Sequence, residues 1–163
     1  MNMRTILGVA LAFGLVCSSA ASSGKIVKTL PHFLDLQGRH TLHPSLFERD
    51  AYQAQLRINP ENCSGIRFDV QWKARGIKTG SARLKLEVKG EKRMPRQLDV
   101  FERDLNVDGM FSRWTGVTIA GEDFAKIGAV QAWRVTLWDG DTLLAEQKSF
   151  LWQTAATPDS PAK

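Results

Sequence analysis

The clearest signal in this chain is a strict alternation of apolar and polar residues in two segments. Residues 66–73 read Ile-Arg-Phe-Asp-Val-Gln-Trp-Lys, and residues 84–89 read Leu-Lys-Leu-Glu-Val-Lys. A period of two places the apolar side chains on one face of a strand and the polar side chains on the other. Glycine-containing stretches at 75–80 and 89–92 separate and follow the two segments, and such stretches suit turns. The pattern predicts an antiparallel pair of strands with one buried face and one charged, solvated face.

Further segments are rich in β-branched and aromatic residues and are bounded by turn formers. They predict strands at 25–30, 33–42 with a bulge at Gly38, 97–103, 111–120, 130–138 and 142–152. The last two flank Asp139-Gly140, a strong hairpin signal because the favoured two-residue turn needs positive φ at both positions. Alternation along this hairpin places six side chains on one face: Trp133, Val135, Leu137, Leu144, Phe150 and Trp152. The opposite face carries Arg134, Thr136 and Trp138.

One segment changes from strand to helical spacing. Phe47, Ala51, Tyr52 and Leu56 recur at the interval of an amphipathic helix, and Ser45 with Glu48 forms a capping-box pattern at its start. Asn59-Pro60 ends it, because a residue before proline avoids the α region. We expect this helix to lie on a sheet, and we expect a short second helix at 122–127.

Seven or eight short antiparallel strands with one helix favour a particular architecture. The chain is predicted to be all-β, an antiparallel two-sheet sandwich of the immunoglobulin or fibronectin kind, with one amphipathic helix near residues 45–57. The Cys…Trp…Cys signature of true immunoglobulin domains is absent. Because this architecture hosts many unrelated functions, it does not indicate one.

The N-terminus has the organisation of an export signal. Arg4 precedes an apolar run at residues 6–16, and small residues follow at 18–24. The run is too short to span a bilayer, which takes about 20 residues, so a retained anchor is the weaker alternative. We predict that residues 1–20 are a removed signal peptide, cut between Ser18 and Gly24, and that the protein is exported to the periplasm or the extracellular space.

Residues 21–153 are predicted to form a single β-sandwich domain, followed by a small, polar, disordered tail at 154–163. Cys17 leaves with the signal peptide, so no internal disulfide can form. Cys63 is then either a partly buried free thiol or a bridge to another chain.

The positive charge is concentrated in one part of the sequence. The whole chain has a formal net charge of +5. Between residues 73 and 96 nine basic residues stand against two acidic ones: Lys73, Arg75, Lys78, Arg83, Lys85, Lys89, Lys92, Arg93 and Arg96. We expect Arg67, Lys73, Arg83, Lys85 and Lys89 to line one face of the first strand pair. That face either attracts a polyanion or is an ordinary solvated surface.

Catalytic and metal-binding patterns are missing from the sequence. It contains no G-x-S-x-G, no phosphate-binding glycine loop and no dedicated nucleic-acid motif. Its histidines are His32, His40 and His43, and on an extended strand positions 40 and 43 face opposite sides. We therefore predict a protein that is not an enzyme and that needs no metal or cofactor.

Five tryptophans provide the best candidates for recognition. Trp72 and Trp133 alternate with apolar residues and are expected in the core. Trp114 and Trp138 fall on the polar parity, so they are either partly exposed or covered by the helix or a second sheet, and the second alternative is favoured because tryptophan is usually well buried. An exposed indole beside an arginine suits a sugar ring or a partner's side chain. The predicted ligand-binding residues are Trp138, Arg134, Trp114, Arg83, Lys85 and Lys89.

Together these features predict an exported, non-catalytic binding or accessory module for a carbohydrate or polyanion. The alternative is a structural or assembly component of the cell envelope that contacts partner proteins, for example through its sheet edges.

Overall fold

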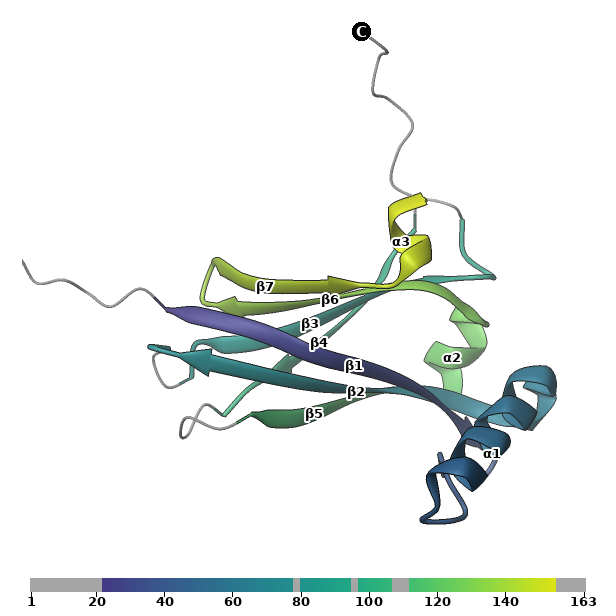
Figure 1. Ribbon diagram of the computed structural model, residues 1–163. Helices are drawn as coiled ribbons and strands as arrows, with labels where there is room; N and C mark the ends of the chain where they lie inside the picture. The colour runs from purple at the N-terminus through teal and green to yellow at the C-terminus, as the bar shows by residue number, and fades with distance from the viewer. Residues whose placement is uncertain (1–21, 78–79, 95–96, 107–111, 155–163) are drawn as a thin grey trace, which may run out of the picture.

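Two antiparallel sheets face each other in the computed structural model, which describes residues 22–77, 80–94, 97–106 and 112–154. One sheet has the order β1-β2-β5, formed by β1 (Ser23–Asp35), β2 (Cys63–Arg75) and β5 (Arg113–Ala120). The other has the order β4-β3-β6-β7 and contains β3 (Ala82–Gly90), β4 (Asp99–Asp104), β6 (Val130–Asp139) and β7 (Thr142–Lys148). Figure 1 shows the two layers edge-on. The predicted immunoglobulin-like or fibronectin-like two-sheet sandwich is confirmed.

The core lies between the sheets and is built from alternate residues of the central strands. Phe68, Leu84, Leu86, Val135 and Leu137 are completely buried. The Phe68 and Trp133 rings meet edge to face, with 6.0 Å between their centroids. Since a fully buried side chain of this size contributes about 1.5 to 3 kcal/mol, these positions dominate the stability of the sandwich. The alternation in the sequence identified them correctly.

The predicted pairing of the first two strands is wrong. β2 pairs with β1 and β5, whereas β3 pairs with β4 and β6, so the two strands belong to different sheets. Alternation shows which side chains are buried, but it does not show which strand lies alongside. As a consequence, Arg67 and Lys73 lie on the outer face of the three-stranded sheet, and the polar side chains of β3 lie on the outer face of the four-stranded sheet. The predicted single basic face does not form.

The N-terminal part forms one strand instead of two. β1 runs from Ser23 through Pro31 to Asp35, which is possible because β1 is an edge strand and the proline nitrogen needs no partner there. The register shifts fall between Ile26 and Lys28 and between Leu34 and Asp35, and Gly38 lies in a turn with φ of 76°, so the bulge predicted at Gly38 is wrong. β1 also lies beside β7, where the Thr29 hydroxyl donates to Gln147 Oε1 at 2.7 Å.

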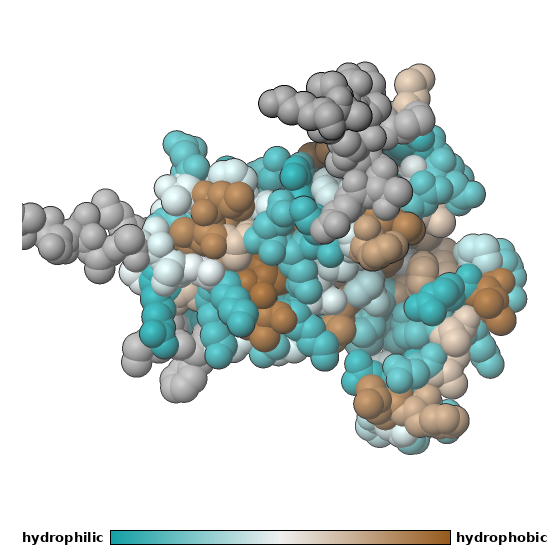
Figure 2. Space-filling model, turned by 45° about the horizontal axis from the view of Figure 1, so that its top comes forward, coloured by the Kyte–Doolittle hydropathy of each residue, from teal (hydrophilic) through white to brown (hydrophobic). Residues whose placement is uncertain are grey.

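The helices lie close to their predicted positions. α1 (Leu46–Ile58) is followed by a 3-10 turn, η1 (Pro60–Asn62), and α2 (Gly121–Ile127) follows β5. The Ser45 side chain makes no capping hydrogen bond. Leu56 is buried but Phe47 is 78% exposed, because α1 lies at the end of the β1-β2-β5 sheet and not over its face (Figure 1). Figure 2 shows hydrophobic side chains on the outside of α1, at the lower right.

The C-terminal part departs most from the prediction. β7 ends at Lys148, and α3 (Phe150–Thr154) turns over the outside of the four-stranded sheet. A register shift at Leu137/Trp138 changes the alternation, and the Ser149 hydroxyl accepts from the Trp133 amide at 3.0 Å. Phe150 is therefore 88% exposed, and the predicted inward face for Phe150 and Trp152 is wrong.

The predicted signal peptide (1–20) lies outside the described residues, as does the predicted tail (154–163) apart from Thr154, which ends α3. Within the described ranges, no helix is long and apolar enough to cross a membrane.

Candidate functional site

Five of the six residues predicted to bind a ligand share the outside of the four-stranded sheet. Arg83, Lys85 and Lys89 extend from β3, and Arg134 and Trp138 extend from β6. Arg83 lies directly opposite Trp138, and Glu87 lies directly opposite Arg134. The sixth, Trp114, belongs to β5 in the other sheet, so the structure does not bring it near the other five.

Three cations of this four-stranded face, Arg83, Lys85 and Arg134, lie within 4.0 Å of carboxylates. Glu87 is 5% exposed and lies 2.7 Å from Arg134 Nε and 3.6 Å from Lys85 Nζ. Burial raises the pKa of Glu87, but the hydrogen bond from Arg134 and the charges of Arg134 and Lys85 outweigh burial and lower it below its ordinary value. Two more ion pairs lie on this face, Arg83–Glu102 at 3.7 Å and Arg134–Glu146 at 3.6 Å. Among the described residues Lys89 has no carboxylate partner, but the charges of Arg83, Lys85 and Arg134 are compensated.

Its tryptophans also have partners within the protein. Trp138 is half-buried, and its indole Nε1 donates to the Thr136 hydroxyl at 2.8 Å. Trp152 is 6% exposed beneath two cations, with Lys89 Nζ 4.7 Å and the Arg134 guanidinium carbon 5.1 Å from its ring centroid. Cations over an indole face are attracted by the ring quadrupole, so these contacts hold α3 against the sheet.

The outside of the three-stranded sheet has a different arrangement, which we call the cationic strip. It consists of four exposed cations on the adjacent ends of β1 and β2: Lys25, Lys28, Lys73 and Arg75. Among the described residues, none of the four has an ion pair within 4.0 Å. Lys25 lies directly opposite Lys73 in the register, and like charges in that position are destabilising.

Trp114 extends this surface onto β5. It is 51% exposed, as its parity indicated, and lies opposite Gln71, which in turn lies opposite Lys28. A shallow hollow of about 250 Å³ lies between the strand ends, lined by Lys25, Lys73 and Arg75 among others. The strip thus combines cations that have no ion pair within the described ranges with an accessible aromatic ring. The cationic strip was not predicted from the sequence, because Lys25 and Lys73 are far apart along the chain.

At the other end of the outer face of the three-stranded sheet, the charged side chains pair with one another. Asp69 accepts a hydrogen bond from Arg67 Nε at 2.8 Å and lies 3.8 Å from His32 Nε2. Burial lowers the pKa of His32, and the charges of His40, Arg49 and Arg67 add to the effect against the opposing pull of Asp69. The described part of the chain holds no cluster of three or more histidine, cysteine, aspartate or glutamate side chains arranged for a metal ion.

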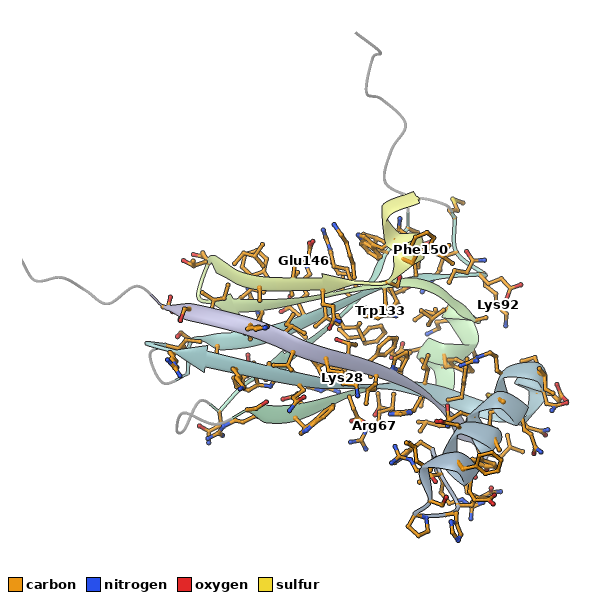
Figure 3. The ribbon with its side chains drawn as sticks, in the orientation of Figure 1. Lys28, Arg67, Lys92, Trp133, Glu146 and Phe150 are labelled. Atoms are coloured by element: carbon orange, nitrogen blue, oxygen red, sulfur yellow. The ribbon has the colours of Figure 1, made fainter. Side chains whose placement is uncertain are left out.

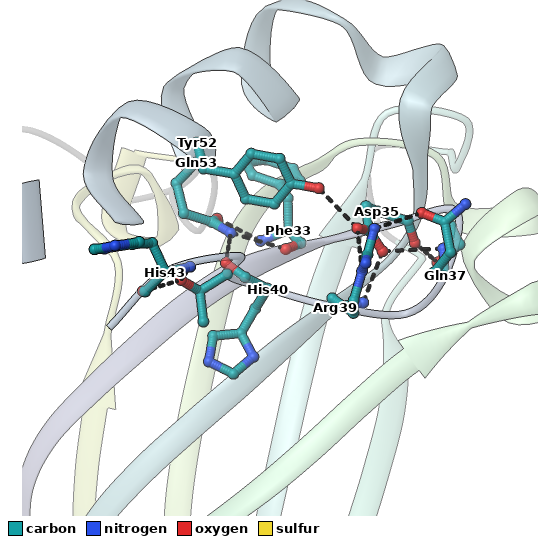
Figure 4. A network of polar contacts seen from close by, with 10 residues as sticks. Phe33, Asp35, Gln37, Arg39, His40, His43, Tyr52 and Gln53 are labelled. Carbon is teal, nitrogen blue, oxygen red and sulfur yellow. Dashed lines mark hydrogen bonds and ion pairs between the residues drawn. The ribbon is translucent and has the colours of Figure 1, made fainter. Parts of the chain in front are cut away.

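A buried polar network joins α1 to β1, as Figure 4 shows. The Tyr52 hydroxyl donates to Asp35 Oδ2 at 2.7 Å, and Arg39 Nε donates to the same oxygen at 2.9 Å. Burial raises the pKa of Asp35, but hydrogen bonds from Arg39, Tyr52 and Gln37 lower it to about 2. Gln53 Oε1 accepts from the Phe33 amide at 2.7 Å. The network is structural, because its hydrogen bonds join α1 and the turn after β1 to β1.

A groove of about 890 Å³ lies between α1 and α2 at one end of the sandwich. Its apolar lining includes Leu56, Phe124 and Val130, and charged residues stand at several points along it. Cys63 also lines it, and its thiol donates to the Leu56 carbonyl at 3.2 Å. Burial and the neighbouring charge of Glu61 raise the pKa of Cys63, so the thiol stays protonated near neutral pH.

The comparisons with known proteins give little further guidance. No family model matches the sequence, and no curated protein matches it. Among solved structures, an immunoglobulin-like protein from Pseudomonas aeruginosa aligns with 80% of this chain and 96% of its own, at 15% identity and a TM-score of 0.38. A likeness of this size carries no argument about function. The fold assignment rests on the strand order of the two sheets.

Proposed function

We propose that this protein is an exported, non-catalytic binding module and that its cationic strip binds a polyanion, such as an acidic polysaccharide. The observation that carries the proposal is the direct opposition of Lys25 and Lys73 without any carboxylate partner among the described residues. Such an arrangement is unfavourable in the free protein, and a bound anion would relieve it.

The strip is small enough to act as one site. Neighbouring strands are about 4.8 Å apart, and two residues along a strand span about 6.8 Å. Both distances are shorter than the Debye length of about 8 Å at physiological salt, so the charges of Lys25, Lys73 and Arg75 reinforce one another. Lys28 lies opposite Gln71, farther along the strip. Trp114 adds an apolar ring face against which a sugar ring can stack.

The residues predicted from sequence on the four-stranded face are weaker candidates for this function. Arg83, Lys85 and Arg134 already lie within 4.0 Å of Glu102, Glu87 or Glu146. An incoming polyanion would compete with these carboxylates and would be repelled by them. The same four-stranded face therefore supplies a matched control for the strip.

Two triple variants with equal loss of charge test the proposal. The strip variant is Lys25→Gln/Lys73→Gln/Arg75→Gln, and the control is Arg83→Gln/Lys85→Gln/Lys89→Gln. Binding of heparin is measured from low to moderate salt by titration calorimetry. We expect the strip variant to reduce the slope of log K against log salt by about 2 to 3, as loss of three contacts predicts. The control should change it little.

Two outcomes would contradict this assignment. Equal losses in both variants would mean that net charge alone attracts the polymer. Failure of the unaltered protein to bind heparin at low salt would remove the site.

A second candidate function is a module for protein contacts. It is favoured by the outer edge of β5, which pairs only with β2 among the described residues.

A further inference from the structure

The four edge strands of the sandwich are not equally protected against pairing with another chain. β1 and β7 lie beside each other and share the Thr29–Gln147 hydrogen bond. β4 is short and carries charged side chains at Asp99, Glu102, Arg103 and Asp104. Short, charged or covered edges are the usual defences against added strands. β5 is longer than β4 and, after Arg113 at its start, contains neither a charge nor a proline from Trp114 to Ala120.

The outer edge of β5 has the extended backbone that pairing with a further strand requires. It is the last strand of its sheet, and within the described ranges no backbone hydrogen bond joins it to a segment other than β2. Val117 and Ile119 are buried in the core, which fixes the register and keeps the strand extended. Trp114, Gly116 and Thr118 face outward and are exposed.

Arg67 gives this edge a charge preference. Its guanidinium lies over Gly116, so that a Cβ placed there would be 2.9 Å from Nη2. Nε donates to Asp69, but neither Nη atom has a hydrogen-bond partner among the described residues, and the side chain is 43% exposed. Figure 3 shows Arg67 projecting from the sheet beside β5. Two guanidinium donors are therefore presented next to the free edge.

We propose that the free edge of β5 accepts an extended strand from a partner protein, with an aspartate or glutamate beside Gly116 that pairs with Arg67. Added strands gain backbone hydrogen bonds from the edge and specificity from alternate side chains. An acidic residue at that outward position satisfies the free Nη donors, and guanidinium–carboxylate pairs are among the stronger hydrogen bonds. This inference does not depend on polyanion binding by the strip.

The charge also argues against a second copy of the chain as the occupant. If two β5 edges paired antiparallel about Gly116 with both outer faces on one side, the two Arg67 guanidinium groups would meet there. Asp69 balances only its own Arg67, so the approach would be repulsive. A partner strand with a carboxylate has the complementary charge.

The test uses two synthetic peptides of about nine residues that alternate threonine and valine. One carries glutamate and the other lysine at the central outward position. Binding is measured by fluorescence anisotropy, and hydrogen exchange of residues 113–120 locates the peptide on the full chain. We expect the glutamate peptide to protect the β5 amides and to bind about tenfold more tightly than the lysine peptide.

Three variants sharpen the test. Arg67→Gln should abolish the preference for glutamate, and Arg67→Lys, which keeps the charge, should retain part of it. Arg103→Gln on the charged edge of β4 is the matched control and should leave the preference unchanged. Absence of protection in β5 at millimolar peptide, or an unchanged preference in Arg67→Gln, would overturn the proposal.

Discussion

The two outer faces of the sandwich both carry lysine and arginine, but they surround these cations differently. On the four-stranded face, Arg134 is within 4.0 Å of Glu87 and Glu146. On the three-stranded face, Lys25 and Lys73 lie opposite each other, and neither has an ion pair among the described residues. The difference lies in the position of carboxylates on neighbouring strands, and not in the density of basic residues along the chain.

The largest expected effect concerns the core that both faces share. Phe68→Ala should reduce the free energy of unfolding by about 3 to 5 kcal/mol, because it removes a fully buried ring and leaves a cavity. Denaturant titration measures the loss. A cost below about 1 kcal/mol would mean that the two sheets are not packed as described.

The next effect tests whether the carboxylates of the four-stranded face mask its cations. Glu87→Gln should cost about 1 to 3 kcal/mol, because it leaves Arg134 and Lys85 without their buried charge partner. Combined with Glu146→Gln, it should also create heparin binding on this face. Unfolding curves and heparin titrations measure the two results. If the double variant binds no more heparin than the unaltered protein, masking is not what separates the faces.

Acid should have a related effect without any mutation. Because the folded-state pKa of Glu87 is below the ordinary value of 4.5, its stabilising contribution is present above about pH 4.5 and is lost as the pH falls through the folded-state pKa. The same protonation unmasks Arg134 and Lys85. Heparin titrations at falling pH should therefore show a second binding site on the unaltered protein. In Glu87→Gln, binding at this face should depend less on pH.

The smallest effect is expected on the strip itself. Lys73→Gln should change the free energy of unfolding by less than about 0.5 kcal/mol, and any change should be stabilising, because it relieves the repulsion from Lys25. Arg134→Gln is the contrasting variant and should destabilise the fold. Comparable losses from both substitutions would mean that Lys73 has a partner in solution.

The sequence predicted what depends on local pattern. Alternation with a period of two predicts which side of a strand is buried, and it correctly places Phe68, Leu86 and Val135 in the core. Trp114 is 51% exposed, as the polar parity of its position indicated, although burial of this tryptophan was the favoured alternative. The helix at Leu46–Ile58 was located from its spacing and its terminating proline.

The rest depends on contacts between distant segments. Arg83 and Arg134 pair with Glu102 and Glu146, which lie on neighbouring strands. Alternation does not show which strands are neighbours, so the neutralisation of these cations could not be predicted from the sequence. Lys25 and Lys73 meet only because β1 and β2 are antiparallel neighbours. The prediction that Trp152 faces inward is wrong because a register shift interrupts the alternation, and no residue pattern in the sequence indicated this shift.

Mapping the bound polyanion on the protein tests the central claim most directly. A short heparin oligosaccharide is titrated into isotope-labelled protein at low salt, and amide and indole shifts are followed by NMR. The account predicts that the largest shifts fall at Lys25, Lys28, Lys73 and Arg75 and at the Trp114 indole, with little change along β3 and β6. Shifts concentrated at Arg83, Lys85 and Lys89 would contradict it.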